Sequence, residues 1–233
     1  MCGIVSYIGP KDPVPILLKG LRRLEYRGYD SAGIALLNKK NLQCLKKAGK
    51  VSYLESIIDD SAIKGFCGIA HTRWATHGEP SDINAHPHLD RTKKIALVHN
   101  GIIENYDVVK EMLKKRGVSF TSATDSEVLV QLISELYFNS KEKLSFEDAV
   151  RAALQEVVGA YGIVVICEDE PEKIIAARMG SPLVLGVGEG EFLIASDASP
   201  IIAHTRNVIY LEDNELVTIK DEKFSISKID SKK

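Results

Sequence analysis

Apolar residues recur along this chain with two different spacings, and each spacing predicts a different kind of element. Short apolar runs predict strands, whereas apolar positions three and four residues apart predict helices. The first part of the chain mixes the two, and from residue 161 onward the pattern predicts strands alone. The predicted strands are 3–8, 32–37, 42–47, 67–71, 95–99, 161–167, 173–178, 183–187, 191–196, 207–211 and 215–219. The predicted helices are 14–24, 103–116, 125–137 and 146–157.

Residues that start and stop helices support these boundaries. Pro13 and Pro15 fit only the first turn of a helix, where a missing N–H costs nothing. Gly117 is typical of a helix C-terminus, and Thr124 with Glu127 fits a capping box before the next helix. Helices gather in the middle of the chain and strands at both ends, which parallel β-α-β units would not do. The sequence therefore predicts an α+β fold with mainly antiparallel sheets covered by helices.

Size and charge narrow the functional classes. The chain has 233 residues, enough for one large domain or two small ones. A net charge of -2 and a pI of about 6.3 leave no broad basic surface, so neither nucleic acid nor a membrane is expected as a partner. No apolar run approaches the roughly 18 residues of a membrane span. The N-terminus does not resemble a signal peptide, so the expected location is cytoplasmic.

The four cysteines do not form a C-x-x-C pair or a disulfide framework, so we expect free thiols in a reducing compartment. Cys44, Cys67 and Cys167 lie within or beside apolar runs, which is typical of small buried residues. Cys2 differs because removal of Met1 would make it the first residue. Its thiol and a free α-amine would then belong to one residue.

The segment 71–90 is dense in groups that bind ligands or do chemistry. It holds four of the six histidines and the only tryptophan, and long loops of this kind are usually functional. His77, His86 and His88 could in principle hold a metal ion, but no acid or cysteine stands at a ligand spacing. We therefore expect no metal, and interpret His86 and His88 as hydrogen-bonded braces of the loop.

Three further positions keep two interpretations each. Arg73 follows a buried strand, so its guanidinium could bind a ligand carboxylate or pair with an acid of the chain. Asp125 could serve the N-terminus of its helix, which is what the pattern alone favours. Asn100 and Gly101 could form a hairpin turn, again the interpretation favoured by pattern, or present an amide and an N–H to an anionic oxygen.

Taken together, several motifs resemble one protein family. The chain is similar over essentially its whole length to class II glutamine amidotransferases, which are N-terminal-nucleophile hydrolases. It resembles most the glutaminase domains of the glutamine–fructose-6-phosphate aminotransferases, because the sequences at 73–78 and 84–88 are typical of that branch and amidophosphoribosyltransferases usually carry tyrosine in place of Trp74. The motifs that carry the resemblance are 1–5, 24–33, 71–78, 99–105 and 124–127.

The resemblance implies a four-layer αββα fold and a set of catalytic roles. Cys2 would be the nucleophile. The side chain of Asn100 and the backbone N–H of Gly101 would form the oxyanion hole. Arg73 would bind the α-carboxylate of L-glutamine and Asp125 its α-amine.

The resemblance also implies supporting roles for further residues. Trp74, Thr76 and His77 would belong to a loop that closes over glutamine. Arg27 would brace the surroundings of the nucleophile, and His86 would support the site as a brace of its own loop. No cofactor is expected.

The expected reaction is hydrolysis of L-glutamine to glutamate and ammonia through a γ-glutamyl thioester, with the α-amine of Cys2 as the base. Residues 2–220 would form the glutaminase domain, and 221–233 a terminal strand and linker toward a sugar isomerase domain that this chain lacks. In the full-length enzyme, a possible homodimer, the ammonia would convert fructose 6-phosphate to glucosamine 6-phosphate. The alternatives are another class II amidotransferase, a glutamine sensor without activity, and a metal-dependent hydrolase.

Overall fold

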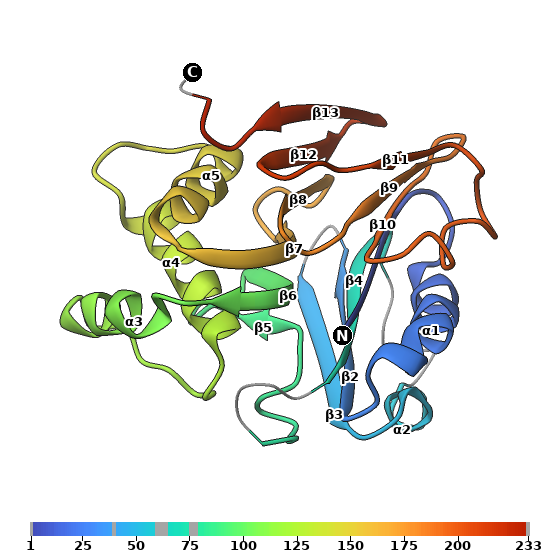
Figure 1. Cartoon of the computed structure of the whole chain (residues 1–233), viewed down its shortest axis with the longest axis horizontal. Coiled ribbons are helices and arrows are strands. Elements are labelled where there is room, and N and C mark those ends of the chain that lie inside the picture. The colour runs from blue at the N-terminus through green and yellow to red at the C-terminus, as the bar shows by residue number, and fades with distance from the viewer. Residues whose placement is uncertain (1, 39–40, 59–64, 75–78, 232–233) are drawn as a thin grey trace.

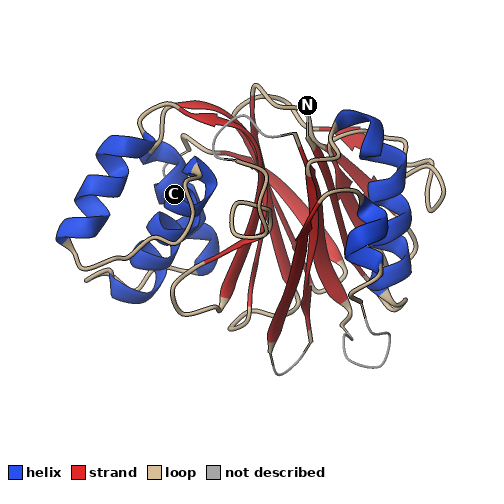
Figure 2. Cartoon of the chain, turned by 90° about the horizontal axis from the view of Figure 1, so that it is seen from below, coloured by secondary structure: helices blue, strands red, loops and turns tan. Residues whose placement is uncertain are grey.

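The computed structural model describes residues 2–38, 41–58, 65–74 and 79–231. Within these ranges the chain forms two antiparallel sheets that lie face to face, with helices on both outer sides (Figures 1 and 2). No helix of the described residues is long and apolar enough to cross a membrane.

The first sheet has seven strands in the order β11-β9-β10-β1-β4-β2-β3. Its centre is formed by β1, which pairs with β10 on one side and β4 on the other, so strands from the start, the middle and the end of the chain lie together. The strands are β1 (Gly3–Ile8), β2 (Ser31–Leu37), β3 (Leu42–Ala48), β4 (Cys67–Arg73), β9 (Val184–Val187), β10 (Phe192–Ala195) and β11 (Val208–Tyr210).

The second sheet has six strands in the order β13-β12-β8-β7-β6-β5. Its longest members, β6 and β7, pair from Ile95 with Cys167 to Ile103 with Gly159. The strands are β5 (His88–Leu89), β6 (Ile95–Ile103), β7 (Gly159–Cys167), β8 (Lys173–Met179), β12 (Glu215–Lys220) and β13 (Lys223–Lys228). The segment 221–233 thus contributes β13, which pairs with β12.

Two groups of helices cover the outer faces of the sheets (Figures 1 and 2). The seven-stranded sheet carries α1 (Pro13–Leu24), the 3-10 turn η1 (Glu25–Arg27) and α2 (Val51–Glu55). The six-stranded sheet carries α3 (Tyr106–Lys115), α4 (Asp125–Asn139) and α5 (Phe146–Glu156). The side chain of Asp12 caps α1 by accepting from the Val14 N–H at 3.0 Å, and that of Thr124 caps α4 by accepting from the Glu127 N–H at 3.2 Å.

Three apolar cores separate four layers. One lies between the sheets and includes Ile4 of β1, Ile69 of β4 and Val98 of β6. A second packs α1 and α2 onto the seven-stranded sheet, and a third packs α3, α4 and α5 onto the six-stranded sheet. The α+β prediction and its αββα layering are confirmed.

Some local predictions were wrong. The pair Asn100 and Gly101 is not a hairpin turn, because β6 continues through it to Ile103 and pairs with β7 throughout. For the same reason α3 begins at Tyr106, three residues after the predicted start at 103. Strand β4 reaches Arg73, two residues beyond the predicted end, and the five-residue helix α2 was not predicted.

Candidate active site

A small cavity lies where the two sheets meet beside the N-terminus. Both sheets and the N-terminal end of α4 contribute to its walls, so residues far apart in the sequence converge there. Its volume is about 30 Å³. The cavity is lined by Cys2, Arg73, Trp74, His86, His99, Gly101, Thr124, Asp125 and Ser126.

Cys2 is partly buried immediately before β1. Its Sγ accepts from the backbone N–H of Trp74 at 3.2 Å and lies 3.5 Å from the Trp74 carbonyl oxygen. Burial raises the pKa of the thiol above its ordinary value, and the hydrogen bond from Trp74 partly offsets the rise. The sulfur therefore needs a nearby base to become a thiolate at neutral pH.

Asn100 and Gly101 stand on β6, across the space between the sheets from Cys2. The Nδ2 of Asn100 donates to the carbonyl oxygen of Cys2 at 3.1 Å, so its amide contacts the backbone of the residue that carries the nucleophile. Gly101 lines the cavity with a backbone φ of +133°, a conformation that favours glycine. An amide and a backbone N–H close to a nucleophile are the donors that an oxyanion hole requires.

Arg73, the last residue of β4, is only 4% exposed. Burial lowers the pKa of its guanidinium, while the nearby charges of Cys2, Asp30 and Asp125 act in the opposite direction. Even so, a guanidinium stays protonated in proteins. A buried cation in the wall of a cavity can bind a carboxylate through two parallel hydrogen bonds.

Asp125 is the first residue of α4 and is 6% exposed. One carboxylate oxygen accepts from the backbone N–H of Ile103 at 2.8 Å, and the other lies 3.4 Å from the Ser126 hydroxyl. The Nδ1 of His99 is 4.0 Å away. The two sequence interpretations are thus compatible, because Asp125 begins a helix and also faces the cavity.

Arg27 connects η1 to the segment that flanks the start of β1. Its guanidinium forms an ion pair with Asp197 at 2.8 Å and donates to the carbonyl oxygen of Ser196 at 3.3 Å. Ser196 in turn hydrogen-bonds Ile4 through its side chain and its backbone. Arg27 therefore braces the backbone two residues from Cys2 without lining the cavity.

His86 belongs to a buried stack of three rings. It contacts His71 and His88, with ring centroids 4.1 Å and 4.7 Å apart and near-perpendicular planes. The Nε2 of His88 lies 3.0 Å from the hydroxyl of Thr124, so the stack reaches the cap of α4. Among the described residues no group of three or more His, Cys, Asp or Glu side chains is arranged to hold a metal ion.

Trp74 lines the cavity and is 46% exposed. Its ring meets that of Tyr29 edge to face, with centroids 5.7 Å apart. Thr76 and His77, predicted to contact the substrate, lie outside the described residues. Of the lining residues, His99 and Ser126 were not assigned a role from the sequence, because strand and helix patterns do not show which side chains face a cavity.

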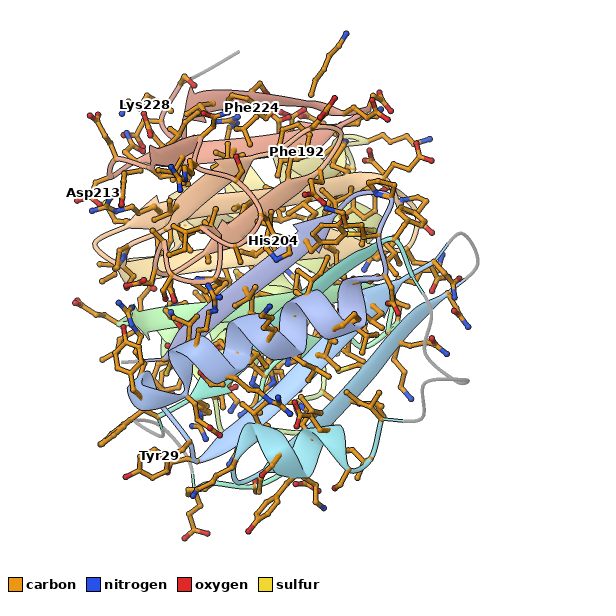
Figure 3. All side chains as sticks on the ribbon, turned by 90° about the vertical axis from the view of Figure 1, so that its right-hand side faces the viewer. Tyr29, Phe192, His204, Asp213, Phe224 and Lys228 are labelled. Carbon is orange, nitrogen blue, oxygen red and sulfur yellow. The ribbon has the colours of Figure 1, made fainter. Side chains whose placement is uncertain are left out.

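A second cavity of about 510 Å³ is larger but has no nucleophile. Its walls are mainly apolar, with Phe66, Phe192 and Ile219, and three carboxylates, Glu172, Asp221 and Glu222, lie among them. Figure 3 shows its Phe192 beside Phe224 near one end of the molecule, whereas Tyr29, which contacts Trp74, lies near the other. We therefore take the smaller cavity as the candidate active site.

Comparison with known proteins gives a consistent result. Residues 71–203 match the family described as "Glutamine amidotransferase domain". The glutamine–fructose-6-phosphate aminotransferase [isomerizing] of Bacteroides thetaiotaomicron is 56% identical over 94% of this chain and 36% of its own length. The enzyme of the same name from Chlorobaculum tepidum is 53% identical over 99% of the chain and 38% of its own length. The chain thus spans little more than a third of these relatives.

Solved structures show the same architecture. Glutamine phosphoribosylpyrophosphate amidotransferase from B. subtilis, complexed with ADP and GMP, superposes with a TM-score of 0.85 at 26% identity. The match covers 99% of this chain and 50% of that one. The resemblance read from the sequence motifs and the fold similarity therefore lead to the same family.

Proposed function

The chain belongs to the family of glutamine amidotransferase domains, and we propose that it hydrolyses L-glutamine to L-glutamate and ammonia with Cys2 as the nucleophile. One observation carries the proposal. The cavity that holds the Cys2 sulfur is also lined by the cation of Arg73 and the carboxylate of Asp125, the two charges needed to bind a free amino acid.

The first step requires a base for the thiol. Once Met1 is removed, the α-amine of Cys2 has an ordinary pKa of about 7.7–8.0 and can accept the thiol proton directly or through a water molecule. The sulfur attacks the δ-carboxamide carbon of glutamine. The developing oxyanion is stabilised by the Asn100 amide and the Gly101 N–H.

The protonated amine then gives its proton to the departing ammonia, and a γ-glutamyl thioester remains. A water molecule attacks the thioester carbonyl, and the same amine takes its proton. The C–S bond breaks, the proton returns to sulfur, and glutamate leaves. Each proton removed in one step is used in the next, so the cycle needs no cofactor.

Recognition of the substrate depends on its two α-groups. Arg73 binds the α-carboxylate as a fork and Asp125 binds the α-ammonium, so glutamine within a peptide is excluded. Trp74, which lines the cavity, contacts the substrate beside Arg73. Arg27 and His86 support the site from outside, Arg27 through Asp197 and His86 through its ring stack.

The use of the ammonia follows from the relatives rather than from this chain. Those relatives are named glutamine–fructose-6-phosphate aminotransferases, and this chain spans little more than a third of their length. We propose that the domain serves a sugar isomerase domain that converts fructose 6-phosphate to glucosamine 6-phosphate, within a homodimer. The four free cysteines fit a cytoplasmic location.

The decisive experiment measures glutamate release from glutamine by protein whose mass shows that Met1 is gone. Cys2→Ala should abolish release. Cys44→Ala is the matched control, because burial raises the pKa of that thiol to about 11 and no step uses it. Hydroxylamine should trap the γ-glutamyl group in the wild type only. Equal rates for wild type and Cys2→Ala would refute the proposal.

Blocking the amine separates this mechanism from its rivals. A form with one extra residue before Cys2 keeps the thiol but turns the amine into an amide, and it should lose at least about 100-fold in rate. A glutamine sensor would bind glutamine without turnover in every form. A metal-dependent hydrolase would lose activity with a chelator, and another class II amidotransferase would show a different acceptor in an ammonia-acceptor screen.

A further inference from the structure

One buried histidine bridges the two sheets beside the proposed site. His71 lies on β4 of the seven-stranded sheet and is 0% exposed. Its Nε2 lies 2.9 Å from the Oδ1 of Asn100 and 3.2 Å from the carbonyl oxygen of His99, both on β6 of the six-stranded sheet. The side chain therefore connects the seven-stranded sheet, whose strand β1 directly follows Cys2, to the six-stranded sheet, which carries Asn100 and Gly101.

The partners of His71 define which nitrogen holds the proton. The carbonyl oxygen of His99 can only accept, so Nε2 must carry a hydrogen to bond it. Burial lowers the pKa of His71 to about 3, so the ring is neutral at neutral pH and has a single N–H. That hydrogen is on Nε2, and Nδ1 is bare.

This tautomer fixes the side-chain amide of Asn100. With Oδ1 toward the N–H of His71, the Nδ2 group faces the carbonyl oxygen of Cys2 at 3.1 Å. The opposite orientation would place two oxygens 3.1 Å apart and turn N–H groups against the N–H of His71. Both ends of the amide therefore favour one orientation.

The amide nitrogen of Asn100 has two hydrogens. Among the described residues, one acceptor is found for them, the carbonyl oxygen of Cys2. The second hydrogen is left for an oxygen that arrives next to the sulfur. His86 steadies the arrangement, because its Nδ1 lies 3.2 and 3.1 Å from the two ring nitrogens of His71 and so sits over the ring face. Rotation of the His71 ring would meet that side chain.

We propose that His71 is a positioning residue for glutamine hydrolysis, whose Nε2–H holds the Asn100 amide with its nitrogen toward the oxyanion. The inference rests on the proposed glutaminase activity and adds a residue to it. His71 does not touch the substrate and acts through Asn100. Its effect is therefore on the transition state, when the oxyanion forms, rather than on binding of glutamine.

The test compares kcat and KM for glutamine in the wild type, His71→Leu, His71→Gln and His71→Asn. Leucine removes the donor, and kcat should fall about 10- to 100-fold, up to the loss expected when an oxyanion donor is misplaced. Glutamine can place an amide N–H where Nε2 stood and should recover most of the loss. Asparagine is shorter and should not. KM should stay within about threefold, because Arg73 and Asp125 are intact.

A double variant shows whether His71 works through Asn100. Asn100→Ala alone should lower kcat by about 10²–10³. Adding His71→Leu to it should change kcat little, because the group that His71 holds is already gone. The inference is overturned if the losses in kcat of the two single variants multiply in the double variant. It is also overturned if His71→Leu is as active as the wild type. A loss in kcat of the same size in His71→Gln and His71→Asn would overturn it as well.

Folding and the parent proposal are controlled separately. Circular dichroism and thermal melts identify a variant that fails to fold, and the comparison of His71→Gln with His71→Asn then carries the test because both introduce the same amide. An active wild type with unaffected His71 variants refutes the positioning role alone. A wild type without glutamate release, after confirmed removal of Met1, refutes the proposed function and this inference with it.

Discussion

Gly101 lies so close to the carbonyl oxygen of Ala160, on the neighbouring strand β7, that a Cβ atom at position 101 would overlap it. The backbone there also has a φ of +133°, which side chains rarely tolerate. Sterics and conformation thus both require glycine. As a result, β6 stays paired with β7 at Gly101, and the Gly101 backbone also lines the cavity.

Replacement of Gly101 by alanine should therefore damage stability and activity together. We expect Gly101→Ala to lower the free energy of unfolding by about 3 kcal/mol, from backbone strain and overlap with β7. Glutaminase activity should fall at least about 100-fold as the N–H moves out of place. Urea denaturation and glutamate release measure the two effects.

Gly117 is the matched control. It also has a positive φ, +81°, but a Cβ there would meet nothing within 4 Å. Gly117→Ala should lower the free energy of unfolding by only about 1 kcal/mol and leave glutaminase activity unchanged. Similar losses in the two variants would mean that contact with Ala160 does not matter.

The fold was largely predictable because its determinants are local. Short apolar runs identified most strands, and the Thr124 cap marked the start of α4. The pattern-based prediction of a turn at Asn100–Gly101 was wrong, because the same dipeptide is typical of a two-residue turn. What keeps it in a strand is its pairing with Gly162 and Tyr161, which lie 62 and 60 residues ahead. Such long-range pairing leaves no trace in a local pattern.

The site was predictable only in part for a related reason. Cys2, Arg73 and Asp125 come from three distant segments, and their roles came from resemblance to a family rather than from spacing. The residues themselves could be singled out by chemistry. His71 could not be assigned a role, because nothing in strand β4 indicates that its ring crosses to the opposite sheet and meets Asn100. Strand periodicity gives the face on which a side chain lies but not the group it meets.

The stacked histidines make stability depend on pH. Burial lowers the pKa of His86 and His88 well below the ordinary histidine value, and that of His71 to about 3. In the unfolded chain all three titrate near pH 6.5. Below that pH the unfolded chain binds protons that the folded chain does not, so stability is complete above pH 6.5 and is lost on acidification. Each ring contributes a slope of up to about 1.4 kcal/mol per pH unit.

Urea denaturation at about pH 7.5, 6 and 5 measures this slope, to which the three rings should add up to about 4 kcal/mol per pH unit. The buried His99, whose pKa burial also lowers, adds to the same slope. His88→Gln should reduce the slope by up to about 1.4 kcal/mol per pH unit, since glutamine can still hydrogen-bond Thr124 but does not titrate. His204→Gln should change it less, because His204 is partly exposed. A free energy of unfolding that is flat from pH 7.5 to 5 would exclude neutral buried histidines.

The buried cation of Arg73 should select for a free α-carboxylate. The wild type should use the α-methyl ester of glutamine at least about 30-fold less efficiently than glutamine, as expected when a buried charge loses its partner at a cost of about 2 kcal/mol. Arg73→Gln should lose efficiency with glutamine and discriminate little between the two substrates. The measurement is kcat/KM for both. Undiminished discrimination in the variant would assign carboxylate binding to another residue.

Asp125 permits a parallel test at the other end of the substrate, with a variant that should still fold. In Asp125→Asn the side-chain oxygen can continue to accept the Ile103 N–H, which now meets the carboxylate at 2.8 Å, so the start of α4 should remain in place. What disappears is the negative charge. Glutaramate, which is glutamine without its α-amine, should therefore be a poor substrate for the wild type, by at least about 30-fold in kcat/KM. Asp125→Asn should lower kcat/KM for glutamine toward the value for glutaramate, and it should hardly change kcat/KM for glutaramate. If the variant instead slows both substrates equally, Asp125 serves the helix and the site geometry rather than the ammonium.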